Sequence, residues 1–282
     1  MKRIIAVAAV QMHVKPLDIN TNLAKAEALI TKACHEQKLD LVVLPEDFLT
    51  GPIGCNLDMA LSLNSAPIKR LQQLALEFKL YLAAGSFIQK ISDNYYNTAL
   101  LIDPAGEVIL EYRKNKPWLP ERRYLTPGNT LPVVKTPIGT IGLLVCWDLA
   151  DPLLSQKLAA KGANIICCPS YWTFEDSNRL DKKYPAAKSS QITMVNTLCS
   201  ARAIENEVLF IYANGALEAS IPLKSKVLHH TQIGQTQICT PLHGTAKRLH
   251  NNAEGFITCS YDHAIAKDVE KVYKLRLDLG EN

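Results

Sequence analysis

A cysteine, a glutamate and a lysine each follow an apolar segment of this 282-residue chain, and together they could carry out nucleophilic chemistry. The thiol of Cys146 would attack a carbonyl carbon, the carboxylate of Glu46 would take the thiol proton, and the ammonium of Lys114 would stabilise the oxyanion. Taken singly, each residue has an ordinary explanation, because buried cysteines, loop carboxylates and basic strand ends are common in folded proteins. Ligand sites collect at the carboxyl ends of strands, so the three residues together predict one site there.

Cys146 lies where a predicted strand gives way to a helical pattern. It closes the apolar run 138–146, Trp147 and Asp148 come next, and a helical pattern covers 151–161. A thiol at such a junction faces the positive end of the helix dipole, which favours the thiolate. We therefore expect Cys146 to be an activated nucleophile.

The spacing of apolar residues alternates between strand and helix patterns along the chain. Strands are predicted at residues 4–10, 40–44, 80–89, 97–103, 107–114, 138–146, 163–169 and 209–214, with further strands in the remainder of the chain. Helices are predicted at residues 18–37, 67–79, 151–161 and 189–207, with a short helix at 264–271. This alternation, interrupted by antiparallel hairpins, predicts an α/β fold with mixed sheets covered by helices. The length and hydrophobic content allow one domain over residues 1–282.

Composition narrows the class of protein. The net charge is +4, and the basic residues are scattered, which argues against a nucleic-acid partner. The apolar run before Gln11 is too short for a membrane span and lacks a processing site, so we expect a first strand and no membrane partner. Eight cysteines without a paired metal spacing suggest reduced thiols in a cytoplasmic protein.

Further motifs surround the three candidate residues in a fixed order. They are Leu44-Pro-Glu-Asp-Phe-Leu-Thr-Gly51, Tyr96-Asn-Thr-Ala99, Asp103-Pro-Ala-Gly106, Tyr112-Arg-Lys114, Glu121-Arg-Arg-Tyr-Leu-Thr-Pro-Gly128, Gly142-Leu-Leu-Val-Cys-Trp-Asp148, Gly162-Ala-Asn164, Pro169-Ser170, Ala201-Arg-Ala-Ile-Glu-Asn206, Asn214-Gly215 and Gly234-Gln-Thr-Gln237. With these motifs the chain resembles the nitrilase superfamily of carbon-nitrogen hydrolases. The match covers most of the chain, from Val7 to Pro241.

The resemblance implies a four-layer α-β-β-α sandwich that usually pairs into homodimers or larger homo-oligomers. It also assigns roles: Glu46 is the general base, Lys114 stabilises the oxyanion and Cys146 is the nucleophile. Glu121 matches an auxiliary carboxylate near the other three. No metal and no organic cofactor is implied.

Pocket residues are predicted around the nucleophile and after the 163–169 strand. The resemblance implies that the backbone N–H of Trp147 is a second oxyanion donor. Tyr171 and Trp172 are further candidates for the pocket. Two segments depart from the usual family pattern: Lys116 and Pro117 replace a His-Leu pair, and residues 150–153 replace an Arg-Phe-Pro-Glu sequence. The polar segment 173–188 is interpreted either as a lid that selects the substrate or as a solvated surface loop.

The chemistry of a thiol and an amide implies a two-step reaction. Attack gives a tetrahedral species, ammonia or an amine leaves with a proton from Glu46, and water hydrolyses the thioester. The predicted activity is hydrolysis of a non-peptide C–N bond in a small amide or N-carbamoyl compound, with nitrilase activity less favoured. A primary amide, an N-carbamoyl compound, an ω-amidated keto acid and a nitrile all stay open as substrates.

Two other classes of function also stay open. A Cys-His hydrolase or acyltransferase would pair Cys146 with His229, His230 or His243, and it would leave Glu46 and Lys114 without a task. A catalytically silent member would act as a binding or scaffold protein. Its Cys146 would then react no faster with an alkylating reagent than the other cysteines.

Overall fold

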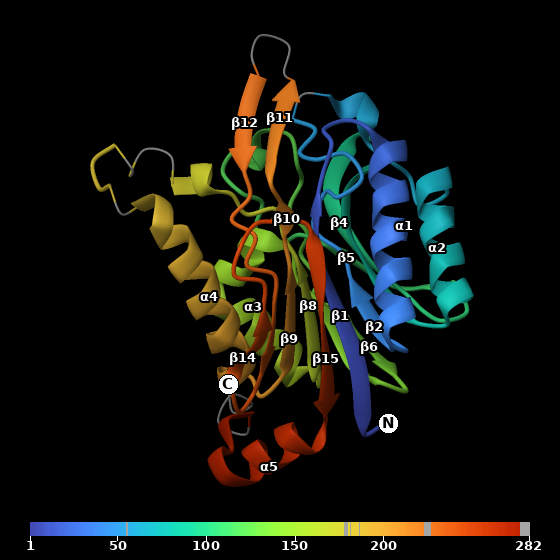
Figure 1. Cartoon of the computed structure of the whole chain (residues 1–282), viewed down its shortest axis with the longest axis vertical. Coiled ribbons are helices and arrows are strands. Elements are labelled where there is room, and N and C mark those ends of the chain that lie inside the picture. The colour runs from blue at the N-terminus through green and yellow to red at the C-terminus, as the bar shows by residue number, and fades with distance from the viewer. Residues whose placement is uncertain (55, 178–179, 181, 186, 223–226, 277–282) are drawn as a thin grey trace.

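Two mixed β-sheets lie face to face in the computed structural model, with helices on both outer faces (Figure 1). The structure describes residues 1–54, 56–177, 180, 182–185, 187–222 and 227–276. This arrangement is the predicted four-layer α-β-β-α sandwich. A further two-stranded sheet stands at one end of the molecule and pairs β11 (Glu218–Pro222) with β12 (Val227–Thr231).

The first sheet has seven strands. Its members are β10 (Gly215–Ala216), β1 (Ile4–His13), β2 (Leu41–Val43), β3 (Tyr81–Ile91), β4 (Asn94–Ile102), β5 (Val108–Arg113) and β15 (Gly255–Asp262). Strands β1, β2 and β3 are parallel, whereas β4, β5 and β15 join antiparallel. A turn at residues 103–106 links β4 and β5, and the carboxylate of Asp103 accepts hydrogen bonds from two backbone N–H groups there.

The second sheet has six strands. They follow in the order β14 (Gly244–Arg248), β13 (Gln237–Thr240), β9 (Leu209–Ala213), β8 (Ile165–Pro169), β7 (Gly139–Leu143) and β6 (Val133–Thr136). The three central strands β7, β8 and β9 are parallel and fully or largely buried. Parallel strands place their carboxyl ends at one edge, which becomes the site described below.

Helices cover the sheets from outside. They are α1 (Ile19–Glu36), α2 (Ala66–Phe78), α3 (Pro152–Ala160), α4 (Ala187–Glu205) and α5 (Ala264–Tyr273), and short 3₁₀ turns are η1 (Leu57–Met59), η2 (Glu121–Arg123), η3 (Cys146–Ala150) and η4 (Phe174–Ser177). Asp18 caps α1 by accepting from Thr21 N, and Asp151 caps α3 by accepting from Leu153 N. None of the described helices is long and apolar enough to cross a membrane.

Successive side chains along a strand point to opposite faces of the sheet and so belong to two different layers of the core. In β1, Val7 and Ala9 belong to the cluster that includes the second sheet, whereas Ala8 and Val10 pack with α1 and α2. Since β1 is buried on both faces, its sequence is apolar almost throughout. Two parallel layers of this kind fix the sheets against each other and hold the strand ends in register.

The predicted elements agree with the structure to within a few residues, with two differences. Strand β6 was missed, because its sequence is short and only partly buried. The apolar run predicted as a strand over 138–146 forms regular strand only to Leu143, and Cys146 already belongs to η3. That one domain extends over residues 1–282 stays a prediction.

Candidate active site

Glu46, Lys114 and Cys146 converge at one end of the sandwich. They follow β2, β5 and β7, so two residues come from the first sheet and one from the second. Their relative exposures are 2%, 2% and 8%, which places all three inside the protein. The face-to-face packing of the sheets is what brings the three strand ends together.

The ammonium of Lys114 lies between two carboxylates. Its Nζ is 2.9 Å from Glu46 Oε1 and 2.7 Å from Glu121 Oε2. Asn97 Nδ2 donates to the same Glu46 oxygen at 2.8 Å. Burial lowers the pKa of Lys114, but Glu121 and Glu46 more than offset this effect and raise it well above its ordinary value. Lys114 is therefore a fixed positive charge.

Glu46 is arranged to gain and lose a proton. Burial raises its pKa, and the neighbouring carboxylate of Glu121 acts in the same direction. Lys114 and the thiol of Cys146 act in the opposite direction by binding the carboxylate. A carboxyl with a raised pKa is a stronger base when ionised, which suits proton transfer with a thiol.

Cys146 has an unusual backbone conformation and a thiol with a raised pKa. Its φ is 48°, in the left-handed region that side chains other than glycine rarely adopt. Burial and the negative charge of Glu46 raise its pKa well above the ordinary value, against the effects of Lys114 and the Tyr171 backbone. The expectation that a helix dipole favours the thiolate was wrong, because Cys146 begins a short 3₁₀ turn instead of an α-helix and its burial raises the pKa of the thiol. Cys146 consequently needs a base.

Asp148 connects η3, the turn that begins at Cys146, to the end of β5, the strand that precedes Lys114. Its Oδ2 accepts from Tyr112 Oη at 2.7 Å and from Val145 N at 2.9 Å, and its Oδ1 accepts from Lys116 N at 2.8 Å. Tyr112 lies two residues before Lys114, and Asp148 lies two residues after Cys146. Burial raises the pKa of Asp148 to about 6 despite these hydrogen bonds. We call this set of bonds the Asp148 clamp.

The predicted pocket residues are Trp147, Tyr171 and Trp172. The two tryptophan rings contact each other, and Tyr171 contacts Cys146 through its backbone. The Trp147 ring lies at tilted angles to the rings of Trp118 and Trp172, with its centroid 4.3 and 5.5 Å from theirs. Trp172 is buried and donates from its indole N–H to Gln191 Oε1, so it supports Trp147. The backbone of Tyr171 forms a hydrogen bond that lowers the pKa of Cys146. The role of the Trp147 N–H as an oxyanion donor stays a prediction.

Three carboxylates of the site are close enough to share a cation. One oxygen each of Glu46, Asp47 and Glu121 lies within 4.8 Å of the other two. Carboxylates bind hard cations such as Mg²⁺. Here, however, the Lys114 ammonium already bonds two of the three, so a positive charge is present at this position without a metal ion.

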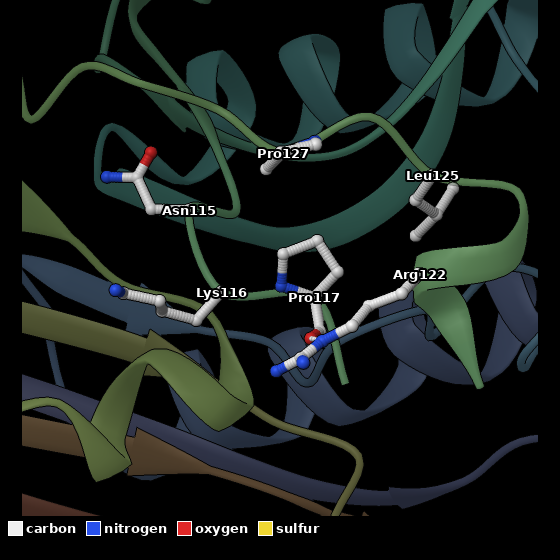
Figure 2. Close-up of a pocket in the computed structure, with 6 residues that line it drawn as sticks. All are labelled: Asn115, Lys116, Pro117, Arg122, Leu125 and Pro127. Atoms are coloured by element: carbon white, nitrogen blue, oxygen red, sulfur yellow. Dashed lines mark hydrogen bonds between the residues drawn. The ribbon is translucent and has the colours of Figure 1, made fainter. Parts of the chain in front are cut away.

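A pocket of about 320 Å³ lies between the residues that follow β5 and the segment 122–127 (Figure 2). Its lining residues are Asn115, Lys116, Pro117, Arg122, Leu125 and Pro127. Figure 2 shows Pro117 between the side chains of Lys116 and Arg122. Lys116 forms an ion pair with Asp151 at 3.0 Å, so the two segments that depart from the family pattern contact each other.

Two of the three histidines of the Cys-His alternative have partners away from Cys146, and the third lies against a pocket residue. The exposed His229 interacts with Ser220 and Glu218, and His243 interacts with Thr240. His230 lies against the Tyr171 ring, with centroids 5.9 Å apart. Among the described residues, the electrostatic effects on the Cys146 thiol come from Glu46, Lys114 and Glu121. This pattern favours the carboxylate as the base.

The polar segment 173–188 is only partly a surface loop. Within its described residues, Thr173 and Ser177 are buried and Asp176 accepts from Thr173 N, whereas Lys182 and Lys183 are exposed. Arg179 and Asp181 lie outside the described residues, as does the side chain of Lys188. Whether the segment acts as a lid stays a prediction.

Comparison with known proteins identifies the family. The family model described as carbon-nitrogen hydrolase matches residues 6–268. The chain therefore belongs to the carbon-nitrogen hydrolase family of the nitrilase superfamily. It is 32% identical over 212 residues to the deaminated glutathione amidase of Dictyostelium discoideum, an alignment that covers 68% of each chain. It is also 32% identical over 175 residues to a bifunctional nitrilase/nitrile hydratase of Lupinus angustifolius, and it spans 49% of that relative's length.

Solved structures have the same fold. Nit3 of Saccharomyces cerevisiae matches with a TM-score of 0.81 and 23% identity, covering 97% of this chain and 95% of Nit3. A carbon-nitrogen hydrolase superfamily protein of Xanthomonas campestris matches with a TM-score of 0.82 and 18% identity over 98% and 97% of the chains. A variant of the Nesterenkonia amidase, with an acetamide moiety on its active-site cysteine, matches with a TM-score of 0.75 and 22% identity over 95% and 96%.

Sequence reasoning gave no role to three residues that the structure places at the site. Asn97 bonds Glu46, Asp148 forms the clamp, and Asp47 brings a third buried carboxyl. All three stand inside motifs that carried the resemblance, which was the available signal. Their contacts join different strands, and no local pattern reveals such pairings.

Proposed function

We propose that the protein hydrolyses a non-peptide C–N bond of a small amide through a thioester on Cys146. The observation that carries the proposal is the buried Lys114 ammonium, held by Glu46 and Glu121 beside the thiol. A cation held in place is suited to stabilising a developing oxyanion. The relative from Dictyostelium, named as an amidase, supports an amide as the substrate.

In the proposed reaction Glu46 moves the proton. Its carboxylate takes the proton of Cys146 as the sulfur bonds the amide carbon, and the oxyanion faces Lys114. Glu46 then protonates the departing ammonia or amine, which leaves a thioester. Water, deprotonated by Glu46, hydrolyses the thioester and frees the thiol. Glu121 holds Lys114 in position throughout, at 2.7 Å.

Ammonia release from a panel of amides, N-carbamoyl compounds, ω-amidated keto acids and nitriles tests the proposal. Wild type should release ammonia from an amide or N-carbamoyl compound, and Cys146→Ala should not, with an unchanged circular dichroism spectrum. The matched control is Cys167→Ala, since Cys167 is a buried cysteine of β8 away from the triad. Equal turnover by wild type and Cys146→Ala contradicts the proposal.

Fluoroacetamide separates an active thiol from a silent one. The Nesterenkonia amidase variant carries the acetamide moiety of this compound on its active-site cysteine. We expect one acetamide moiety per chain, located at Cys146 by peptide mass spectrometry, and a slower reaction in Glu46→Gln. Uniform labelling of all eight cysteines would favour a binding protein.

A nitrile is the second candidate substrate, because curated relatives from Lupinus angustifolius are named as nitrilase/nitrile hydratases. The same panel decides between the two. Release of ammonia from nitriles but not from amides would replace the amide in the proposal. We also propose a cytoplasmic homodimer that binds neither nucleic acid nor membrane and needs no metal or cofactor.

A further inference from the structure

Several buried polar atoms beside the nucleophile have no hydrogen-bond partner. Among the described residues they include Asp47 Oδ1, Tyr171 Oη, His230 Nδ1 and both amide atoms of Gln232. Asp47, Tyr171 and Gln232 are each more than nine-tenths buried. Leaving buried polar groups without partners costs stability, so a set of them in one place points to a ligand that supplies the partners.

These residues lie close together although they come from separate segments. Burial and the Asp47 carboxyl raise the pKa of Tyr171, whereas the side chain of Gln232 lies close enough to the Tyr171 hydroxyl to lower that pKa as a hydrogen-bond partner. Asp47 Oδ1 and Gln232 Oε1 are then the acceptors open to a further donor. The Tyr171 ring faces His230, and Thr173 forms a β-bridge with Gln232. The Tyr171 backbone in turn forms a hydrogen bond that acts on the Cys146 thiol. The group is therefore linked to the site at two places, through the Tyr171 backbone at Cys146 and through an Asp47 oxygen within 4.8 Å of one of Glu46.

The titratable groups around these atoms are mainly acidic. The main charges acting on the Tyr171 hydroxyl are the carboxylates of Asp47, Asp176 and Glu175. The last two already accept backbone hydrogen bonds, at 2.8 Å from Thr173 N and 2.7 Å from Thr231 N. Asp47 keeps one oxygen free, so it is the carboxylate that is open to a ligand.

The backbone conformation of Asp47 is unfavourable, and its surroundings disfavour the ionised form of its carboxyl. Its φ is 48°, its carboxyl is buried, and burial together with Glu46 and Glu121 raises its pKa well above the ordinary value. Lys114, which bonds Glu46 and Glu121, makes no hydrogen bond with Asp47 among those found in the described part of the chain. A positive group bound at Asp47 would relieve the repulsion among the three carboxylates.

We propose that Asp47, Tyr171 and Gln232 bind the non-reacting end of the substrate, and that this end carries a positively charged amino group. An ammonium offers three hydrogen-bond donors, which matches the open acceptors of Asp47 and Gln232 together with the Tyr171 hydroxyl. A carboxylate at the same place would meet three acidic side chains. This inference rests on the proposed amide hydrolysis and names the substrate class within it.

Four amides of one chain length test the charge preference. They are δ-aminovaleramide, δ-hydroxyvaleramide, valeramide and glutaramate, which end in an ammonium, a hydroxyl, a methyl and a carboxylate. Because a charge-assisted hydrogen bond discriminates by about tenfold to a hundredfold, kcat/KM should be at least about tenfold higher for δ-aminovaleramide than for δ-hydroxyvaleramide. Glutaramate should be the poorest substrate. A preference for glutaramate or valeramide overturns the inference.

Two variants test whether Asp47 and Tyr171 cause the preference for the amide that carries an ammonium. Asp47→Asn should bring the ratio of kcat/KM for δ-aminovaleramide and δ-hydroxyvaleramide close to one. The matched control Asp58→Asn changes an exposed aspartate of η1 and should leave the ratio at its wild-type value. If Asp47→Asn does not fold, Tyr171→Phe, which removes only the hydroxyl, should raise KM for δ-aminovaleramide more than for valeramide. An unchanged ratio in both variants overturns the assignment to these residues.

Binding measured without turnover keeps the two proposals apart. If no amide releases ammonia, the proposed function has failed, whatever the charge preference. Thermal shifts of Cys146→Ala with each of the four amides then test the inference alone. A larger shift with δ-aminovaleramide than with valeramide supports the subsite, and an equal or smaller shift overturns it.

Discussion

Glu46 determines how activity depends on pH, because only its ionised form accepts the thiol proton. Burial raises its pKa above the ordinary carboxyl range, against the effects of Lys114 and Cys146. Activity is therefore lost as the pH falls through that raised value. We expect kcat/KM on an amide to fall on an acid limb above the ordinary pKa of 4.5, while circular dichroism stays constant.

Glu46→Gln keeps the shape of the side chain but cannot accept a proton. The turnover number should fall by about 10² or more at neutral pH. Its control is Glu111→Gln, a carboxylate of β5 that pairs with Arg113. Full activity of Glu46→Gln, together with loss of activity on changing His230, would favour the Cys-His mechanism.

Lys114 occupies the place between carboxylates where a metal ion would bind. We therefore expect prolonged dialysis against a chelator to leave the rate of amide hydrolysis unchanged, as measured by ammonia release. Added Zn²⁺ should not raise the rate. Loss of activity on chelation and its return with zinc would contradict this prediction.

Among three neighbouring basic residues, only Lys114 points into the site. Lys114→Met should lower the turnover number by about 10² to 10³, since one oxyanion donor is lost. It should also lower the unfolding free energy by about 3–5 kcal/mol, because Glu46 and Glu121 lose their buried counter-ion.

The controls for Lys114 lie on either side of it. The guanidinium of Arg113 lies over the Tyr96 ring, and Lys116 pairs with Asp151 near the surface. Such exposed pairs contribute at most about 1 kcal/mol, so Arg113→Met and Lys116→Met should keep near-normal turnover and melting temperature. A larger loss of turnover in Lys116→Met than in Lys114→Met would move the cationic role to Lys116.

At the scale of elements, the Asp148 clamp connects β5 to η3 and so sets the distance between cation and nucleophile. Tyr112→Phe removes one charge-assisted hydrogen bond, which contributes about 1.5–3 kcal/mol. A small misplacement of reacting groups costs up to about 10² in rate, so kcat should fall by about tenfold to a hundredfold with a modest change in KM.

The clamp also predicts a pH effect that a purely structural tyrosine would not produce. The Tyr112 hydrogen bond lowers the pKa of Asp148, so Tyr112→Phe should raise that pKa further from about 6. Protonated Asp148 accepts fewer hydrogen bonds from Val145 N and Lys116 N, and the acid limb of kcat should move to higher pH. Tyr96→Phe on β4 is the control, and an identical pH profile in both variants would contradict the positioning role.

A glycine on β3 allows the Glu46 loop to approach the sheet. Gly85 has a φ of 60°, and a Cβ there would lie 2.1 Å from Pro45 O. This close approach occurs at a bulge between Ala83 and Ser86. Strand β3 thus forms a support for the loop that carries Glu46.

At the scale of the whole molecule, the resemblance predicts that two sandwiches stack into a homodimer. Sedimentation equilibrium should then give a mass of twice 31.2 kDa at micromolar concentration. Dilution should recover the monomer mass if association is reversible. A mass of 31.2 kDa at every concentration would contradict the predicted dimer.

Much of the fold could be predicted from sequence because most elements bury one face. Helix α1 was predicted from the spacing of Leu23, Ala26, Ile30 and Ala33, of which the last three are buried and Leu23 is half-buried. Strands β2 and β8 were predicted as short apolar runs, and both are fully buried. Strand β6 has only partly buried residues, so periodicity gave no signal for it.

The sequence by itself determined most of the elements and the order of the motifs. It also identified Glu46, Lys114, Glu121 and Cys146 as candidates, because apolar periodicity and motif spacing depend only on the order of the residues. Only the tertiary structure decided that the pKa of the Cys146 thiol is raised, since the pKa of a thiol depends on how much water and charge surround it. It also decided that one carboxylate oxygen of Asp47 is buried without a hydrogen-bond partner. These properties arise where two sheets meet, and the residues that create them are far apart in sequence.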